Sequence, residues 1–346
     1  MKAFYADEQK RHDPKGFLSS GAPKPNPEQP ERVERLLAGA RAAGCEIVRP
    51  RQHGLGPIAA VHTPEYLDFL EHIHARWQRI PEASEEVIPN IHPIARGGSY
   101  PASAVGQAGY HMADTSCPIS AETWESSLWS AWSAVEAAEA VLSGEPAAYA
   151  LCRPPGHHAF ADVAGGFCFI NNSAVAAQRL RKDAARVAIL DVDLHHGNGT
   201  QGIFYARPDV LTVSIHADPV RFYPFFWGHA DERGEGLGLG YNLNLPLARK
   251  SADAEFLAAL DKGLQRIRAF APEALVVALG LDAFEGDPFG GLSVTTQGFA
   301  RIAEAIAGLG LPTVIVQEGG YLCDALSDNL TSFLTGFGGA HRLASG

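Results

Sequence analysis

Five short apolar runs in this chain each end in polar, ionisable or glycine-rich residues. The runs are rich in Val, Ile, Leu and Ala, and they occupy residues 147–152, 187–193, 209–215, 274–281 and 312–317. Helical patterns lie between them at residues 172–182, 254–270 and 296–307. Alternating strands and helices predict a doubly wound α/β fold, in which helices cover both faces of a parallel sheet. Because the strands span most of the chain, we expect a single domain over residues 1–346.

Ahead of these strands, apolar residues recur with helical spacing at residues 30–43 and 64–77, and again from residue 121. The segment in between, residues 78–119, is rich in proline and shows no sustained period. Irregular stretches of this length inside a compact domain are usually functional. We therefore expect this insertion at the mouth of an active site or at a subunit interface, with a disordered surface loop as the alternative.

Composition excludes several classes of partner. The formal net charge of −11 argues against nucleic acid, because phosphate binding needs a basic surface. No apolar run approaches the roughly 20 residues that a membrane-spanning helix needs. The five cysteines are scattered and include no C-x-x-C pair, which is typical of reduced thiols rather than of a disulfide framework. We expect a soluble cytoplasmic protein.

The ends of the predicted strands carry the candidate chemistry. In open α/β sheets the ligand binds beyond the carboxyl ends of the strands. The polar residues found there, in chain order, are 153–158, 191–198, His216, Asp282 and 318–321. One strand that ends in an aspartate indicates nothing, but several such ends together predict a shared site.

A metal site is predicted from three of these residues. Asp193 and His195 stand two apart at a strand end, so their side chains leave on the same side. Asp282 enters from a different strand. Two carboxylates and one imidazole leave an open coordination position, as a catalytic zinc requires, although Fe²⁺, Co²⁺ or Mn²⁺ also suit such ligands. A metal held there would polarise a carbonyl and lower the pKa of bound water toward roughly 7.

Hydrolysis of an amide also needs a base for the water, an acid for the leaving amine and a donor for the oxyanion. His157 and His158 are candidates for the first two roles. Tyr321, which follows the Gly319-Gly320 pair, is the candidate oxyanion donor, and the glycines would let the backbone approach the substrate closely. Together these residues predict a metal-dependent amide hydrolase.

Each of these features also has an ordinary structural explanation. A histidine pair is often part of a core, an aspartate at a strand end often caps the next helix, and a Gly-Gly-Tyr sequence is often just a turn. Asp191 and Asn198 are the candidates to fix the second ring nitrogen of the histidines. Because four strand ends would need such explanations at once, we favour the functional interpretation.

No G-x-S-x-G elbow and no glycine-rich phosphate loop occurs, which disfavours serine hydrolases and nucleotide-binding proteins.

The segments that carry these residues resemble the histone deacetylase superfamily, in particular bacterial acetylpolyamine amidohydrolases and class II histone deacetylase-like amidohydrolases. The resemblance rests on RPPGHHA (153–159), GGFCFINN (165–172), ILDVDLHHGNGTQ (189–201), LGLDAFEGDP (279–288) and QEGGY (317–321). It implies the arginase/deacetylase fold, with a central eight-stranded parallel sheet flanked by helices. It also implies one Zn²⁺ per chain, held by Asp193, His195 and Asp282.

The same resemblance implies roles for the remaining catalytic residues. His157 would pair with Asp191 and supply electrostatic help. His158 would pair with Asn198 and act as the general base and acid, while Tyr321 polarises the substrate carbonyl.

The resemblance further implies a substrate tunnel, structural potassium and self-association. The substrate-binding residues would be Gly166, Phe167, Tyr223 and Gly319. One potassium site would involve Asp191, Asp193, His195, Ser214 and Ile215, and a second would lie near Phe204, Arg207, Val210 and Tyr241. The partners would be a small acylated amine and further copies of the chain, as a homodimer or higher homo-oligomer associating through residues 78–119.

One departure and several alternatives bear on the substrate and the reaction. Acetylpolyamine members of the family tend to carry an acidic residue where this chain has Val105, and an apolar side chain cannot pair with a distant ammonium. Protein acetyl-lysine or another small acyl-amide is therefore an alternative substrate.

A binuclear ureohydrolase of the same fold is disfavoured, because Gly197 and Phe284 occupy the positions of its extra ligands. A non-catalytic binder of acetylated ligands is disfavoured by the complete set of ligands and catalytic candidates.

Overall fold

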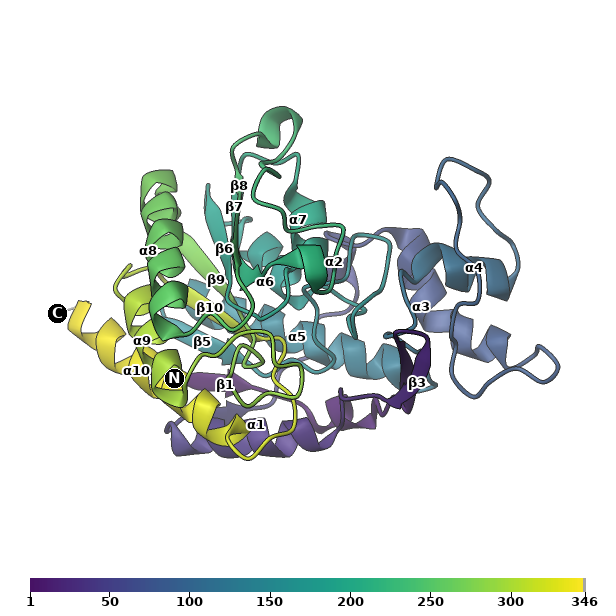
Figure 1. Ribbon diagram of the computed structural model, residues 1–346, viewed down its shortest axis with the longest axis horizontal. Helices are drawn as coiled ribbons and strands as arrows, with labels where there is room; N and C mark the ends of the chain where they lie inside the picture. Colours follow the sequence, from purple (N-terminus) through teal and green to yellow (C-terminus); the bar gives the residue numbers. More distant parts are fainter. Residues whose placement is uncertain (345–346) are drawn as a thin grey trace.

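The computed structural model describes residues 1–344 and contains one large sheet of eight parallel strands (Figure 1). The strand order is β4-β1-β5-β10-β9-β6-β7-β8. The strands are β1 (Lys2–Phe4), β4 (Glu46–Val48), β5 (Ala147–Ala150), β6 (Val187–Asp191), β7 (Val210–Ala217), β8 (Asn242–Leu247), β9 (Ala274–Leu279) and β10 (Thr313–Gln317). This arrangement confirms the predicted α/β fold with its central eight-stranded parallel sheet.

Helices cover both faces of the sheet because successive strand residues point to opposite sides. On β9, Val277 packs into one hydrophobic cluster with helices α1, α8, α9 and α10, and Val276 packs into another with α5 and α6. The helices of the chain are α1 (Glu31–Ala42), α2 (Gly56–Ala59), α3 (Pro64–Trp77), α4 (Ala104–His111), α5 (Thr123–Leu142), α6 (Asn172–Leu180), α7 (Asn198–Phe204), α8 (Asp253–Phe270), α9 (Thr296–Ala307) and α10 (Leu326–Ala344).

The five strands predicted from apolar runs are all present, but three further strands have no such pattern. Strands β1 and β4 have three residues each, which is too short for a recognisable run. Strand β8 lies at the sheet edge, where buried asparagines alternate with half-buried residues and Pro246 is tolerated. These three strands were expected only through the family resemblance.

The segment of residues 78–119 is more ordered than its sequence indicates. It contains helix α4, whose first turn is capped by the hydroxyl of Ser103, and an antiparallel bridge between Val87 and Ile119. Both bridge residues are buried in a third hydrophobic cluster, which α3, α4 and α5 also enter. The segment is thus partly regular although its sequence shows no sustained period, because its few apolar residues pack against neighbouring helices. A small antiparallel hairpin, β2 (Gly16–Ser19) with β3 (Ala22–Pro25), lies apart from the main sheet.

His62 illustrates how a buried imidazole supports the start of a helix. Its Nε2 accepts the backbone N–H of Asn171, the N-cap residue of α6, at 2.9 Å, and its Nδ1 lies 3.3 Å from the carbonyl of Ala161. Burial lowers the pKa of His62 from 6.5 to about 4, because protonation would charge a buried ring. Protonation would also remove the acceptor that Asn171 uses.

This environment predicts a loss of stability in mild acid. The pKa of His62 is lower in the folded state than in the unfolded state, so its contribution is present above pH 6.5 and is lost as the pH falls toward 4. Between pH 6.5 and about 5.5, the free energy of unfolding of the wild type should fall about 1 kcal/mol more than that of His62→Gln. Denaturant unfolding at both pH values measures this difference, and equal falls in the two proteins would contradict the assignment.

No helix within residues 1–344 is both long and apolar enough to cross a membrane. All five cysteines are free thiols.

Candidate active site

The predicted site residues converge because the strands that precede them are neighbours in the sheet. Strands β5, β10, β9 and β6 are adjacent in that order. Parallel strands end at the same edge, so the residues that follow these four meet there. His157 and His158 follow β5, Tyr321 follows β10, Asp282 follows β9, and the Asp193–His195 segment follows β6.

Asp193, His195 and Asp282 form the one group of His, Cys, Asp and Glu side chains in the described part of the chain that could hold a metal ion, with candidate ligand atoms within 4.8 Å of one another. The Nδ1 of His195 lies 3.0 Å from Asp282 Oδ2 and 3.4 Å from Asp193 Oδ1. Backbone N–H groups fix both carboxylates by hydrogen bonds: Gly319 donates to Asp193 Oδ2 at 2.8 Å, and Leu194 donates to Asp282 Oδ1 at 3.2 Å. The three candidate ligands are therefore held close together before any metal binds.

The charge balance of this group suits a bound cation. Both aspartates are fully buried, and among the side chains that the structure describes their ion-pair partners are only the rings of His157 and His195. Burial, together with the negative charge of Asp193, raises the pKa of Asp282. Burial opposes ionisation of Asp193 as well, but the neighbouring histidines outweigh it and hold its pKa well below the usual range. A divalent metal would compensate the two buried carboxylates, so the residues present fit the implied group.

The two histidines are fixed differently. The Nδ1 of His157 lies 2.9 Å from Asp191 Oδ2, and the Nδ1 of His158 lies 2.7 Å from Asn198 Oδ1. Burial opposes protonation of His157, but the charges of Asp193 and Asp191 prevail and raise its pKa to about 10. Burial and the positive charges of nearby histidines lower the pKa of His158 well below its usual value. The raised pKa of His157 favours its protonated form, whereas the lowered pKa of His158 favours the neutral ring, in which Nδ1 donates to Asn198 Oδ1 and Nε2 bears the lone pair.

A cavity of about 250 Å³ opens onto these groups. Its wall includes His158, His195 and Tyr321, and also Gly166, Phe167 and Tyr223. Gly319 does not line it; this residue instead holds Asp193 through its N–H, and an added Cβ would lie 2.5 Å from Asp282 Oδ2. The structure thus brings three of the four predicted substrate-binding residues to the cavity wall. The fourth, Gly319, instead contacts the carboxylates of Asp193 and Asp282.

Aromatic rings make up much of the cavity wall. The ring of Phe167 lies 5.8 Å from that of Tyr321, and Tyr223 meets His158 edge-on at 4.9 Å. Phe289 packs 4.8 Å from Tyr321, and Phe17 of the β2–β3 hairpin packs 5.9 Å from Phe167. Sequence reasoning missed Phe17 and Phe289, because nothing in an isolated phenylalanine distinguishes a cavity wall from a core.

Asp114 is a further residue that sequence reasoning missed. Its Oδ2 accepts the hydroxyl of Tyr223 at 2.7 Å and the N–H of Gly166 at 3.1 Å. Ser116, two residues later, lines the cavity itself. The end of the 78–119 segment therefore supports the cavity wall directly, through contacts that a lone Asp in the sequence does not reveal.

The residues of the predicted potassium sites lie in two groups around β7. Asp191 and Ser214 are register partners on β6 and β7 and line a small internal cavity, and Ile215 follows in the buried β7 strand. In the second group, the N–H of Arg207 donates to the carbonyl of Phe204 at 2.9 Å. The carbonyl of Tyr241 accepts the N–H of Thr212 at 3.0 Å, two residues beyond Val210.

Gly197 occupies a position where a binuclear centre would need a ligand, and the surrounding loop leaves no room for a side chain there. A Cβ at this position would lie 2.3 Å from Asp191 Oδ2 and 3.2 Å from His157 Nδ1. A carboxylate side chain there would collide with the pair that orients His157. The loop is therefore built around a glycine, and the binuclear arrangement stays disfavoured on steric grounds.

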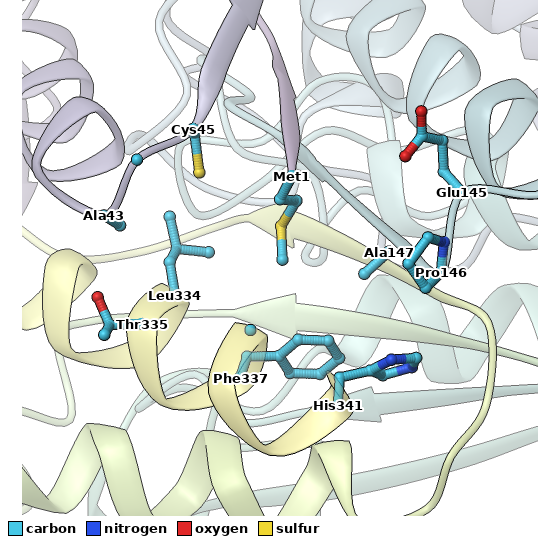
Figure 2. A pocket seen from close by; sticks show the side chains of 12 residues that line it. Met1, Ala43, Cys45, Glu145, Pro146, Ala147, Leu334, Thr335, Phe337 and His341 are labelled. Carbon is cyan, nitrogen blue, oxygen red and sulfur yellow. The ribbon is translucent and has the colours of Figure 1, made fainter. Parts of the chain in front are cut away.

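A second cavity lies at the opposite ends of the strands. Figure 2 shows residues that line it, including Met1, Cys45, Glu145, Phe337 and His341. Met1 precedes β1 and Ala147 begins β5, so this cavity is at the amino ends of the strands. Its titratable residues do not form a metal-binding group, in contrast to those at the carboxyl edge.

The fold and the donor set together define the class: an α/β protein of the arginase/deacetylase fold with three side chains that could hold a metal ion. The family model for the histone deacetylase domain matches residues 26–337. The chain belongs to the histone deacetylase family.

The chain is also similar to individual proteins over its whole length. It is 50% identical to the acetylpolyamine amidohydrolase of Burkholderia pseudomallei, over 98% of this chain and 99% of the relative. It is 42% identical to the acetylpolyamine amidohydrolase of Mycoplana ramosa, over 98% of this chain and 100% of the relative. A crystal structure of the acetylpolyamine aminohydrolase from Burkholderia pseudomallei superposes with a TM-score of 0.96, covering 98% of this chain and 99% of that chain.

Proposed function

We propose that this protein hydrolyses the amide bond of N-acetylated amines, with acetylpolyamines as its substrate class, and releases acetate and the free amine. One observation carries the proposal: Asp193 and Asp282 group with His195, and His195 lines the same cavity as His158 and Tyr321. Two relatives that match the full chain bear the name acetylpolyamine amidohydrolase, which supports this substrate class.

The metal, proposed as a single Zn²⁺ with Fe²⁺, Co²⁺ or Mn²⁺ as possible substitutes, would supply Lewis acidity and a lowered pKa for bound water. His158 is neutral, so its Nε2 takes a proton from the attacking water and later delivers a proton to the leaving amine. Asn198 fixes the ring through Nδ1. Asp191 holds His157, and the raised pKa of His157 favours the protonated ring that would stabilise the negative charge as it develops.

Tyr321 completes the set as the oxyanion donor. Burial raises the pKa of Tyr321 well above 10, so its hydroxyl keeps its proton at neutral pH. A hydroxyl at the cavity wall donates a hydrogen bond to the substrate carbonyl oxygen as negative charge grows there.

The position of Val105 bears on the doubt about polyamines. Its side chain packs against the cluster of hydrophobic residues around α3 and α4, and it is not among the residues that line the cavity. With Val105 at this position the chain lacks one acidic side chain that could pair with a substrate ammonium. Because Val105 does not line the cavity, it does not block the entry of a cationic amine. The net charge of −11 also favours cationic substrates.

A substrate panel tests the proposal. We expect the zinc-loaded protein to cleave N-acetylputrescine and N-acetylspermidine with higher kcat/KM than an acetyl-lysine peptide. A preference for the peptide would establish the alternative, a protein deacetylase. Binding without turnover of any member would establish a non-catalytic binder of acetylated ligands.

Three further proposals concern the environment of the enzyme. Asp191 and Ser214 beside a small cavity support one structural K⁺, and the carbonyl groups of Phe204 and Tyr241 support a second. Exposed Ile91 and Ile94 in the 78–119 segment support a homodimer or higher homo-oligomer, which sedimentation would reveal. Five free thiols support a cytoplasmic location.

A further inference from the structure

The side chain of Glu318 connects two loops of the site, although it does not line the cavity. It is fully buried directly after β10. Its Oε2 accepts the backbone N–H of Gly156 at 2.6 Å and that of His157 at 3.0 Å. Its Oε1 accepts the hydroxyl of Ser173, in the first turn of α6, at 2.7 Å. One carboxylate therefore fixes the loop that carries both catalytic histidines.

The backbone of Glu318 is equally constrained. Its N–H donates to the carbonyl of Leu279 at the end of β9, and its own carbonyl accepts the guanidinium of the buried Arg32 at 2.8 Å. The next residue, Gly319, holds Asp193, and Tyr321 follows two residues later. Glu318 thus lies between the histidine loop on one side and the oxyanion donor on the other.

We propose that Glu318 is a positioning residue that sets the distance between His158 and Tyr321. The inference rests on the proposed hydrolase function. The proton acceptor and the oxyanion donor come from different strands, and no direct hydrogen bond is seen between their side chains within the described residues. The Glu318 carboxylate joins their loops by hydrogen bonds, and misplacement of catalytic groups by about 1 Å can cost roughly 10²-fold in rate.

The competing explanation is that Glu318 only satisfies buried amides and stabilises the fold. Substitutions that keep either the length or the charge of the Glu318 side chain distinguish a positioning role from a purely structural role. A glutamine of the same length can accept both N–H groups with its carbonyl and donate its amide to the hydroxyl of Ser173, since a hydroxyl both donates and accepts. An aspartate keeps the charge but is one methylene too short to reach both partners. Length, rather than charge, is what positioning requires.

The test compares kcat and KM of Glu318→Gln, Glu318→Asp and Glu318→Ala with wild type on N-acetylputrescine. Each protein is zinc-loaded, its metal content is measured, and assays run below its thermal unfolding temperature. We expect Glu318→Gln to retain kcat within about threefold, and Glu318→Asp and Glu318→Ala to lose about tenfold or more in kcat with KM and zinc content unchanged. Ser173→Ala is the matched control, because it removes only one of the three donors, and its kcat should change little.

Several outcomes would overturn the inference. Retained kcat in Glu318→Asp with loss in Glu318→Gln would show that charge matters instead of position. Lower thermal stability with wild-type kcat in all variants would leave Glu318 a purely structural residue. If the shorter variants do not fold, Glu318→Gln still decides, because a loss of more than about tenfold in that variant contradicts positioning by length. Absence of turnover in wild type would instead refute the proposed function.

Discussion

Asp282→Asn is expected to eliminate turnover and to reduce bound zinc from about one ion per chain to nearly none. Asp282 supplies one of only two carboxylates in the metal group, and its Oδ2 faces His195 Nδ1 at 3.0 Å. A neutral amide is a weaker ligand, so the metal and several kcal/mol of transition-state stabilisation are lost, which corresponds to more than about 10³-fold in kcat. The fold should persist, because the substitution keeps the size of the side chain.

The exposed Asp231 provides the matched control for this experiment. Asp231→Asn makes the same chemical change away from the cavity and should keep both zinc and activity. Metal analysis and steady-state kinetics on the purified proteins give the two readouts. Wild-type zinc content and kcat in Asp282→Asn would show that this carboxylate is not a ligand.

Tyr321→Phe is expected to lower kcat by about 10²- to 10³-fold, or roughly 2.7–4 kcal/mol, as the loss of one oxyanion donor does in other hydrolases. The remaining ring still packs against Phe167 and Phe289, so stability and metal content should not change. The hydroxyl is needed only as charge develops on the carbonyl oxygen, so the loss should fall mainly on kcat rather than on KM.

The half-buried Tyr205 lies outside the cavity, so Tyr205→Phe is the control for removal of a tyrosine hydroxyl. Its kinetics should match those of wild type. An unchanged kcat in Tyr321→Phe would mean that another group donates to the oxyanion, and the role proposed for Tyr321 would be wrong.

The sequence predicted the centre of the molecule better than its periphery, for a physical reason. Central strands such as β6 and β9 are buried on both faces, so they appear as continuous apolar runs, and the ligands follow directly after them. Edge strand β8 and helix α4 depend on tertiary contacts, which leave little periodicity in a single sequence. Their existence could not be derived from local pattern.

The same distinction applies to the site. Asp193 and His195 are recognisable because they come within four residues of the end of a buried apolar strand, β6. Asp114 and Glu318 act through hydrogen bonds to residues far away in the sequence, namely Tyr223 and the backbone of Gly156 and His157. Such long-range partners become visible only when the loops are placed in space.

The most direct measurement is a titration of metal-free protein with Zn²⁺, in which the release of acetate from N-acetylputrescine is followed. We expect no release without metal, a rate that rises in proportion to added zinc, and saturation at about one ion per chain, because Asp193, His195 and Asp282 are the one group among the described side chains that could hold a metal ion. Turnover by the metal-free protein, or saturation only at two ions per chain, would contradict it.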